Sequence, residues 1–304
     1  WSSDVCSSDL HIGCSRGLSE RSHHTRGGTE FHPSAAVFMA LSPSVMGIIN
    51  VTPDSFFPEG RSSSSEQAIR RGIEMFAAGA DIVDVGGEST RPGADDVSEE
   101  VEIARVVPVV RELASYGPVS IDTQKPDVAR AAVAAGATVV NDVSASLMSV
   151  AGELGVGYVG MHRQGTAHTM QINPHYDNVV LEVRDFLHRV AEESLAAGVR
   201  QLWLDPGIGF GKTAHHNVQL LAHLDVLRTL CDSFACGLLI GTSRKRFLGT
   251  LSPLDLEVDE RLEGSIATEA WSLLHGADMV RVHDVPAAVY LRELVTMPYE
   301  EVTT

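Results

Sequence analysis

Short apolar runs rich in β-branched residues recur along this chain from residue 44 almost to its C-terminal end. We expect eight of these runs to be strands, because each is short and is bounded by Gly, Pro or polar residues. The predicted strands cover residues 45–49, 81–85, 119–121, 138–140, 158–161, 201–204, 238–240 and 279–282. Between them, apolar residues recur at helical spacing. The predicted helices cover residues 65–78, 98–114, 126–135, 147–154, 179–197, 215–230, 260–275 and 285–296.

Gly79, Gly136, Gly198 and Gly276 each stand between a predicted helix and the next predicted strand. Glycine is preferred just past the end of a helix, because it adopts the left-handed backbone conformation without a steric cost. Strict alternation of strands and helices is typical of a parallel sheet, and eight units of this length predict a single closed (β/α)8 TIM barrel. A doubly wound open sheet is the alternative, for which fewer units are expected.

Residues 1–43 differ from the rest of the chain. They are rich in Ser, Gly and His, contain the near-repeat SSDVCSSDL and have no apolar periodicity. Residues 1–10 lack the basic start and apolar region of a secretory signal. The first ten residues resemble a translated sequencing adapter, and a disordered native tail is the alternative. We therefore expect a non-native or disordered extension over 1–43 and one barrel domain over 44–304.

The charge balance of the 304-residue chain limits its partners. It has 23 Lys and Arg against 40 Asp and Glu, a formal net charge of −17. We therefore expect no binding of nucleic acid or of anionic membrane surfaces. No run approaches the ~20 apolar residues that span a bilayer. Its four cysteines form neither a disulfide framework nor a pattern with zinc spacing, so we expect a cytoplasmic protein.

Polar side chains follow every predicted strand, at the barrel end where enzymes of this fold carry their active sites. Asp122, Asn141 and Asp205 follow three of the strands. Short carboxylates and amides in such places suit the N–H edge of a flat amino-heterocycle. Each residue alone is equally compatible with an ordinary loop or helix cap. Together, the three predict a site for a polar ring.

A second set of residues after the strands predicts an anion site. Its basic members are Arg91, Lys245, Arg281 and His283. We expect them to bring positive charge to an otherwise acidic protein, and the forked guanidinium group of arginine suits phosphate. The alternative for Arg281 and His283 is a structural ion pair with Asp284.

The glycine-rich segment 86–93 adds to this anion site, because backbone N–H groups can approach a bound phosphate there. Asn50 and Thr90 are candidates for the ligand shell of a magnesium ion or a phosphate. The segment 207–213 resembles a P-loop, but Pro206 stands where that motif requires glycine. We interpret this segment as an active-site loop whose Phe210 packs beside the ring.

In their order along the chain, these motifs resemble those of the dihydropteroate synthase family. The segments are 50–56 (NVTPDSF), 86–93 (GGESTRPG), 121–123 (IDT), 141–143 (NDV), 205–212 (DPGIGFGK), 243–245 (SRK) and 281–284 (RVHD). The resemblance extends from Ser44 to about Val295. It implies a transferase that joins 6-hydroxymethyl-7,8-dihydropterin diphosphate to 4-aminobenzoate, yielding diphosphate and 7,8-dihydropteroate for folate biosynthesis.

The resemblance also implies roles for individual residues and a homodimer. The dihydropterin is implied to bind Asp122, Asn141, Asp205 and Lys245. The diphosphate is implied to bind Thr90, Arg281 and His283, while Arg91 and Ser89 belong to a mobile loop and Asn50 is a ligand of Mg²⁺. The expected catalytic residues are Arg91, Lys245, Arg281 and His283.

Four positions depart from the family's pattern. Pro58 stands where the family has a loop Asp, with Glu59 after it, and Arg246 stands where many members have Ser. Met161-His162-Arg163 replaces the usual Met-His-Met. A catalytically impaired pterin-binding paralogue therefore remains an alternative, as does a pterin-dependent corrinoid methyltransferase.

Overall fold

The computed structural model describes residues 42–52, 61–89, 93 and 96–297, with the backbone alone at 61–64. Eight parallel strands form a closed barrel in chain order, and the first strand pairs with the last. They are β1 (Ser44–Asn50), β2 (Ile82–Gly86), β3 (Val119–Asp122), β4 (Val139–Asp142), β5 (Gly157–Met161), β6 (Leu202–Asp205), β7 (Gly237–Ile240) and β8 (Met279–Val282). The predicted barrel is confirmed, and the open sheet is excluded. Residues 1–41 of the extension predicted over 1–43 lie outside the described residues.

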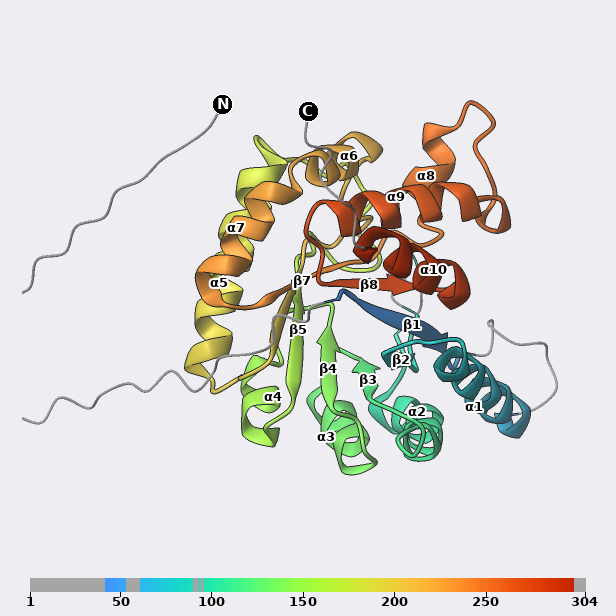
Figure 1. Ribbon diagram of the computed structural model, residues 1–304. Coiled ribbons are helices and arrows are strands. Elements are labelled where there is room, and N and C mark those ends of the chain that lie inside the picture. Colours follow the sequence, from blue (N-terminus) through green and yellow to red (C-terminus); the bar gives the residue numbers. More distant parts are fainter. Residues whose placement is uncertain (1–41, 53–60, 90–92, 94–95, 298–304) are drawn as a thin grey trace, which may run out of the picture. The chain divides into compact units, whose positions relative to one another are not determined.

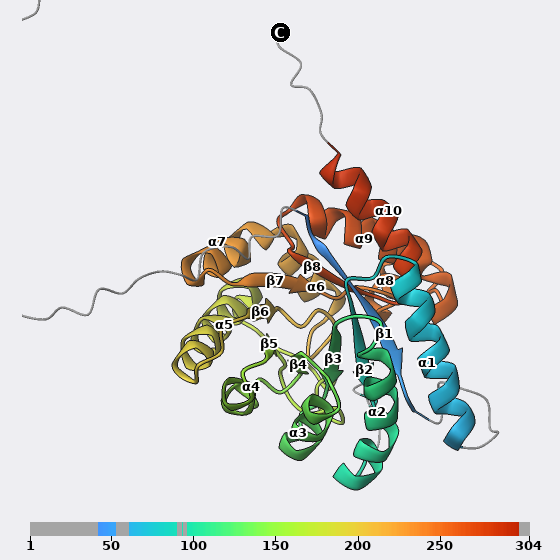
Figure 2. The same cartoon turned by 60° about the horizontal axis from the view of Figure 1, so that its bottom comes forward.

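The helices lie around the strands (Figures 1 and 2). They are α1 (Arg61–Ala77), α2 (Glu99–Leu113), α3 (Pro126–Ala134), α4 (Met148–Leu154), α5 (Val179–Ala196), α6 (Ala214–Ala222), α7 (Leu224–Phe234), α8 (Arg246–Leu251), α9 (Leu262–Leu274) and α10 (Val285–Thr296). A short 3₁₀ helix, η2 (Val258–Glu260), precedes α9. Within the described residues, each predicted helix has a counterpart, but the prediction missed α8 and η2.

One predicted helix, residues 215–230, is two helices in the structure. The chain leaves helical geometry at His223, whose φ of −125° and ψ of 39° separate α6 from α7. The indole N–H of Trp271, on α9, donates to the carbonyl oxygen of Leu221 at 2.8 Å. This tertiary contact satisfies a carbonyl group that a helix end leaves without an intrahelical partner.

The four glycines predicted to end helices all have positive φ. Their φ angles are 97° at Gly79, 119° at Gly136, 89° at Gly198 and 90° at Gly276. Side chains rarely tolerate this backbone conformation. Each glycine therefore lets the chain reverse from a helix into the following strand.

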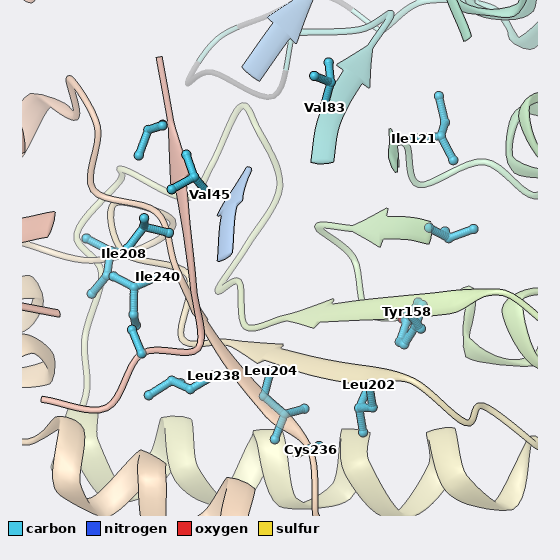
Figure 3. Packing of buried hydrophobic residues seen from close by; sticks show 14 of the residues in the cluster. Val45, Val83, Ile121, Tyr158, Leu202, Leu204, Ile208, Cys236, Leu238 and Ile240 are labelled. Atoms are coloured by element: carbon cyan, nitrogen blue, oxygen red, sulfur yellow. The ribbon is translucent and has the colours of Figure 1, made fainter. Parts of the chain in front are cut away.

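The barrel has an apolar layer on each side of its wall. Outward-facing residues such as Val83, Ile121 and Leu238 pack against the helices and belong to the larger cluster (Figure 3). The smaller cluster consists of Met46, Ile82, Val139, Val159, Leu239 and Met279. Because side chains alternate between the two faces of a strand, these residues share the inward face.

The same alternation places polar residues above the inner apolar layer. Two residues after Ile82 comes Asp84, and two after Val139 comes Asn141. Asp122 is paired in register with both Gly86 and Asn141. Buried charged and amide groups therefore meet inside the barrel at the carboxyl ends of its strands.

Candidate active site

Arg281 holds the centre of this polar layer together. Its Nε donates to Asp84 Oδ2 at 2.7 Å, and its Nη2 donates to Asp122 Oδ2 at 2.7 Å. Asn141 Nδ2 donates to the same oxygen of Asp84 at 2.9 Å. Four strands, β2, β3, β4 and β8, thus contribute to one buried network. The predicted alternative, an ion pair of Arg281 with Asp284, is not among the contacts of the described residues.

Two carboxylate oxygens of this network have no partner. Asp84 Oδ1 and Asp122 Oδ1 are buried and accept no hydrogen bond from the described residues. Burial raises the pKa of Asp122 to about 7, and Arg281 opposes this rise. A buried acceptor without a donor is costly, so Asp122 is suited to accept N–H groups from a bound molecule.

A second polar group lies at the ends of β6 and β7. Asp205 Oδ1 accepts from the backbone N–H of Gly207 at 2.7 Å. Burial raises the pKa of Asp205, and Lys245 opposes this rise. Lys245 Nζ donates to the carbonyl oxygen of Ile208 and lies 4.8 Å from the centre of the Phe210 ring. The loop after β6 therefore supplies an aromatic face beside a cation, and burial lowers the pKa of that lysine to about 8.

Two glycines leave room between these groups. Gly86 and Gly241 belong to the inward-facing sets of β2 and of the segment after β7. A Cβ at Gly86 would lie 3.5 Å from Asp122 Cβ, and a Cβ at Gly241 would lie 3.7 Å from Lys245 Nζ. Larger side chains at these two positions would fill the space that Asp122 and Lys245 border.

His283 lies at the end of β8 as a neutral imidazole. Its backbone N–H donates to Ser243 Oγ at 3.1 Å, and its Nδ1 lies 3.2 Å from the same hydroxyl. Burial, with Arg281 and Arg244 nearby, lowers the pKa of His283 to about 3. The structure therefore favours a neutral His283 over the positive charge predicted for it. Asp284 instead pairs with Arg244, with an Nη2–Oδ1 distance of 2.8 Å.

A buried lysine anchors the loop after β6 to β5. Lys212 Nζ is 2.8 Å from His162 Nδ1 and donates to the carbonyl oxygens of Gly207 and Phe210 at 2.9 and 3.0 Å. Burial lowers the pKa of both side chains, that of His162 to about 2. In the segment that resembled a P-loop, the lysine thus points into the protein, where these contacts occupy its amino group.

The comparisons with known proteins agree on one family. The family described as pterin binding enzyme matches residues 46–283. The dihydropteroate synthase of Escherichia coli (strain K12) is 43% identical over 261 residues, covering 83% of this chain and 90% of the relative. That of Mycobacterium leprae is 46% identical over 267 residues, covering 83% and 92%. The chain belongs to the dihydropteroate synthase family.

Solved structures of the family share the fold. The dihydropteroate synthase of Xanthomonas albilineans with 4-aminobenzoic acid has a TM-score of 0.76 and 44% identity, covering 83% of this chain and 92% of that one. The same enzyme in complex with 7,8-dihydropteroate has a TM-score of 0.73 and 41% identity, with the same coverage. The predicted resemblance is confirmed, and the chain is a transferase of this family rather than a corrinoid methyltransferase.

The structure brings most of the predicted site residues of this synthase together. Asp122, Asn141, Asp205, Lys245, Arg281 and His283 all lie at the carboxyl ends of barrel strands or directly after them. Asn50, the last residue of β1, pairs in register with Gly86. The predictions for Thr90 and Arg91, and the departures at Pro58 and Glu59, concern positions outside the described residues. Arg246 is exposed at the first position of α8.

Sequence reasoning missed Asp84 and Lys212. Asp84 lies inside the predicted strand 81–85, whereas most of the predicted site residues follow their strands. The sequence feature that could have indicated Asp84 is its spacing. It stands two residues after Ile82 and two before Gly86, so all three share the inward face of the strand. Lys212 had no such signal, because its burial depends on the path of the loop after β6.

Among the described residues, no group of three or more His, Cys, Asp or Glu side chains is arranged to hold a metal ion. Within the same part of the chain, no helix is long and apolar enough to cross a membrane.

Proposed function

We propose that this synthase condenses 6-hydroxymethyl-7,8-dihydropterin diphosphate with 4-aminobenzoate, forming 7,8-dihydropteroate and diphosphate for folate biosynthesis. The observation that carries this proposal is the buried network of Arg281, Asp84, Asp122 and Asn141, in which two carboxylate oxygens have no partner. A pterin ring has an edge of N–H donors that satisfies such oxygens. Relatives with 4-aminobenzoic acid and with 7,8-dihydropteroate support the choice of substrates.

The dihydropterin lies, in this proposal, in the space bordered by Asp122, Asn141, Asp205 and Lys245. Asp122 and Asp205 accept N–H groups from the ring, and Asn141 both donates and accepts. The protonated Nζ of Lys245 donates an N–H hydrogen bond to the ring, and Phe210 packs against the ring.

The diphosphate lies at the mouth, near Arg281 and His283. Arg281 is already fixed by two carboxylates, so its remaining N–H groups are oriented before the substrate arrives. His283, which is neutral, contributes a hydrogen bond rather than a charge. Thr90 and Arg91 remain predicted partners of the same leaving group and its loop.

The reaction exchanges one bond at the methylene carbon. The C–O bond to diphosphate breaks, and its electron pair leaves with the phosphate oxygen. The amine nitrogen of 4-aminobenzoate supplies the electron pair of the new C–N bond and then releases a proton to solvent. Arg281 and His283 stabilise the leaving group by electrostatics, which is the main contribution that a preorganised site makes.

We propose Mg²⁺ as the cofactor, with Asn50 as its protein ligand. A Cβ at Gly86 would lie 3.7 Å from both Asn50 Oδ1 and Asp122 Oδ2, so oxygen donors border one small space. Mg²⁺ commonly takes one or two protein oxygens and completes its shell with substrate phosphate and water, so these residues fit it. When bound, the ion would neutralise charge on the diphosphate. Asn50→Ala should raise the Mg²⁺ concentration that gives half-maximal turnover, and an unchanged value would reject this role.

The proposed reaction is tested by release of diphosphate from the pterin substrate with and without 4-aminobenzoate. We expect release only with both substrates and appearance of dihydropteroate in equal amount. Binding of the pterin diphosphate without turnover at high enzyme concentration would favour the impaired paralogue. In that case, Pro58→Asp is expected to restore the rate, because the family has Asp at this position.

We also propose a homodimer formed through α9 and α10. These two helices pack together, and both expose large apolar side chains, Trp271 and Leu274 on α9 and Tyr290 and Leu294 on α10. Large apolar side chains that stay exposed on two packed helices suit a protein interface. Sedimentation should give a dimer at micromolar concentration, and Leu274→Glu with Tyr290→Glu should give a monomer. A monomeric unmodified chain would reject the proposal.

We place the protein in the cytoplasm without nucleic acid or membrane partners. Its net charge of −17 opposes both kinds of polyanionic surface. Cys231 and Cys236 are free and buried, which suits a reducing compartment. Cell fractionation of a tagged chain tests the location, and retention by nucleic acid or anionic vesicles at physiological salt would contradict the absence of these partners.

A further inference from the structure

Helix α9 contacts the turn after β7 through a row of polar side chains. Ser265 Oγ accepts from the backbone N–H of Arg244 at 2.8 Å, and Thr268 Oγ1 donates to Thr242 Oγ1 at 2.9 Å. Glu269, one helical turn after Ser265, is buried as well, and Ser243 lies close enough to its carboxyl group to lower its pKa by hydrogen bonding. These contacts connect α9 to the residue whose hydroxyl lies against His283.

Glu269 is an acid that the proposed reaction does not use. It is 2% exposed, and its Oε1 is buried without a hydrogen-bond partner among the described residues. Ser243, also buried, lies between this carboxyl group and the imidazole of His283. A chain of three polar groups therefore runs from the inside of α9 to the proposed diphosphate site.

The hydrogens in this chain can be counted. Ser243 Oγ has one proton to donate and two lone pairs that accept. The backbone N–H of His283 occupies one lone pair. If Glu269 is protonated, its O–H occupies the other, and the hydroxyl proton is left for His283 Nδ1. If Glu269 is ionised, it accepts the hydroxyl proton, and Nδ1 must carry a hydrogen of its own.

We propose that Glu269 is a positioning residue that acts through Ser243 to hold His283 as the tautomer with its proton on Nε2. The benefit of this tautomer, a hydrogen bond to the departing diphosphate, rests on the proposed function. In this tautomer Nε2 donates a hydrogen bond, as contact with a departing diphosphate requires. In the other tautomer Nε2 has a lone pair, which repels an anion.

The protonation of Glu269 agrees with this assignment. Burial, assisted by Asp284 and opposed by the hydrogen bond with Ser243, raises the pKa of Glu269 to about 8, so the acid is mainly protonated at neutral pH. Of the charged groups on neighbouring elements, Arg244 is paired with Asp284, and Arg281 on β8 is paired with the carboxylates of the network.

The remaining titratable groups on elements packed against α9 lie on α8, α6 and α10. They are Arg246, His215, His216, Tyr290, Arg292 and Glu293. None of these six contributes to the shift in the pKa of Glu269. Asp284 is thus the charged side chain whose removal should lower this pKa, and Glu269 should ionise as the pH rises through about 8.

The tautomer of His283 is measured directly by ¹⁵N NMR of chains labelled at histidine, without substrate or turnover. Comparison with His283→Gln assigns the signal among the 13 histidines. At pH 7 we expect the proton on Nε2, and between pH 7 and 9.5 we expect a shift toward Nδ1. A proton on Nδ1 at pH 7 would overturn the proposal even if the enzyme turns over as proposed.

Two substitutions of Glu269 separate positioning from packing. Glu269→Gln keeps a neutral donor of the same shape, so it should retain the Nε2 proton and lose the dependence on pH. Glu269→Leu removes the donor and should give a mixture of tautomers. Its kcat should fall by a larger factor than the factor by which its KM for the pterin substrate changes. A pH dependence in Glu269→Gln equal to that of the unmodified chain would reject the role, whether or not Glu269→Leu folds.

Thr268→Val is the matched control. It removes a hydrogen bond between the same helix and the same turn, but not the one to Ser243. The tautomer of His283 and its dependence on pH should be unchanged. A change equal to that caused by Glu269→Leu would mean that α9 acts on His283 only by packing, which would also overturn the proposal.

Discussion

At the scale of single residues, the buried charges of the barrel depend on one another. Asp84 is fully buried and accepts from both Arg281 and Asn141. Removing one partner of a buried ion pair is costly, because it leaves the other charge uncompensated. The structure thus assigns Asp84 a role comparable to that of the predicted ring-binding residues.

Asp84→Asn should lower the free energy of unfolding by about 3–5 kcal/mol. Turnover should fall on the order of 10²-fold, because Arg281 loses its fixed orientation. Urea denaturation and the diphosphate-release assay measure the two effects. Glu153→Gln, which removes the carboxylate from an exposed pair with Arg130, is the control and should change neither. Equal stability of Asp84→Asn and the unmodified chain would contradict the structural role.

A second prediction at this scale concerns Lys245 and pH. Because its pKa in the folded protein is lowered to about 8, Lys245 loses its proton as the pH rises above 8. Affinity for the pterin substrate should therefore fall between pH 8 and 10, as measured by calorimetric titration. Lys245→Arg keeps its charge in this range and should remove this step.

The loss of affinity should not come from unfolding. The pKa of Lys245 is lower in the folded chain than its ordinary value of 10.5, so between pH 8 and 10.5 the unfolded chain binds more protons at this site. The contribution of Lys245 to the free energy of unfolding therefore increases with pH in this window. The contribution of Lys245 to the free energy of unfolding is measured as the difference between the unmodified chain and Lys245→Arg. If this contribution decreased with pH together with the affinity, the loss of affinity could not be assigned to deprotonation of Lys245 in the folded chain.

The position of a site residue along its strand decided whether the sequence could predict it. Asp122, Asn141 and Asp205 end their strands, and the fold type alone directs attention there. Asp84 stands one layer deeper, so it required the alternation of inward and outward residues as well. The partners of Arg281 could not be predicted, because they depend on which side chains meet across the closed barrel.

At the scale of elements, the ends of helices decide the fold as much as their apolar faces do. Gly136 and Gly198 both follow helices and both have positive φ. They differ in their surroundings: a Cβ at Gly136 would lie 2.7 Å from Ala114 Cβ, whereas nothing lies within 4 Å of a Cβ at Gly198. The pair therefore separates backbone strain from steric overlap.

Gly198→Ala should cost about 1–2 kcal/mol of unfolding free energy, from the left-handed backbone alone. Gly136→Ala should cost more, because Ala114 or the backbone around it must also move. Denaturant unfolding of the two variants measures the difference. Equal costs would mean that the chain near Ala114 moves freely, in conflict with the packing described.

Elements with strong local signals were predicted, and those set by distant contacts were not. The glycine stops and the β-branched runs predicted eight strands in their observed order. The break at His223 was missed because the sequence is apolar at helical spacing on both sides of it, and because one of its contacts comes from Trp271. Helix α8 is only six residues long, too short for a periodic pattern.

At the scale of the whole molecule, the barrel begins where the family match begins. The backbone N–H of Ser44, at the start of β1, donates to the carbonyl oxygen of Asp278 at 2.8 Å, and the family match starts at residue 46. We therefore propose that the barrel domain starts at residue 44 and that it folds without residues 1–43.

A chain without residues 1–43 should retain its thermal midpoint and its turnover within error. Segments rich in Ser, Gly and His bury too little apolar surface to offset the entropy of ordering. A variant that begins at residue 35 and keeps the apolar stretch 35–41 is the matched comparison. A midpoint several degrees lower in the shorter variant alone would show that this stretch belongs to the fold.

The polar layer inside the barrel serves catalytic activity at the expense of thermal stability. Two unpaired carboxylate oxygens and a partly buried arginine occupy a position where apolar side chains would pack at lower free energy. Selection for thermal stability alone, without selection for growth on the product, should therefore replace this layer first and leave the surrounding wall intact. A barrel evolved in that way would be a better-folded protein and no longer an enzyme.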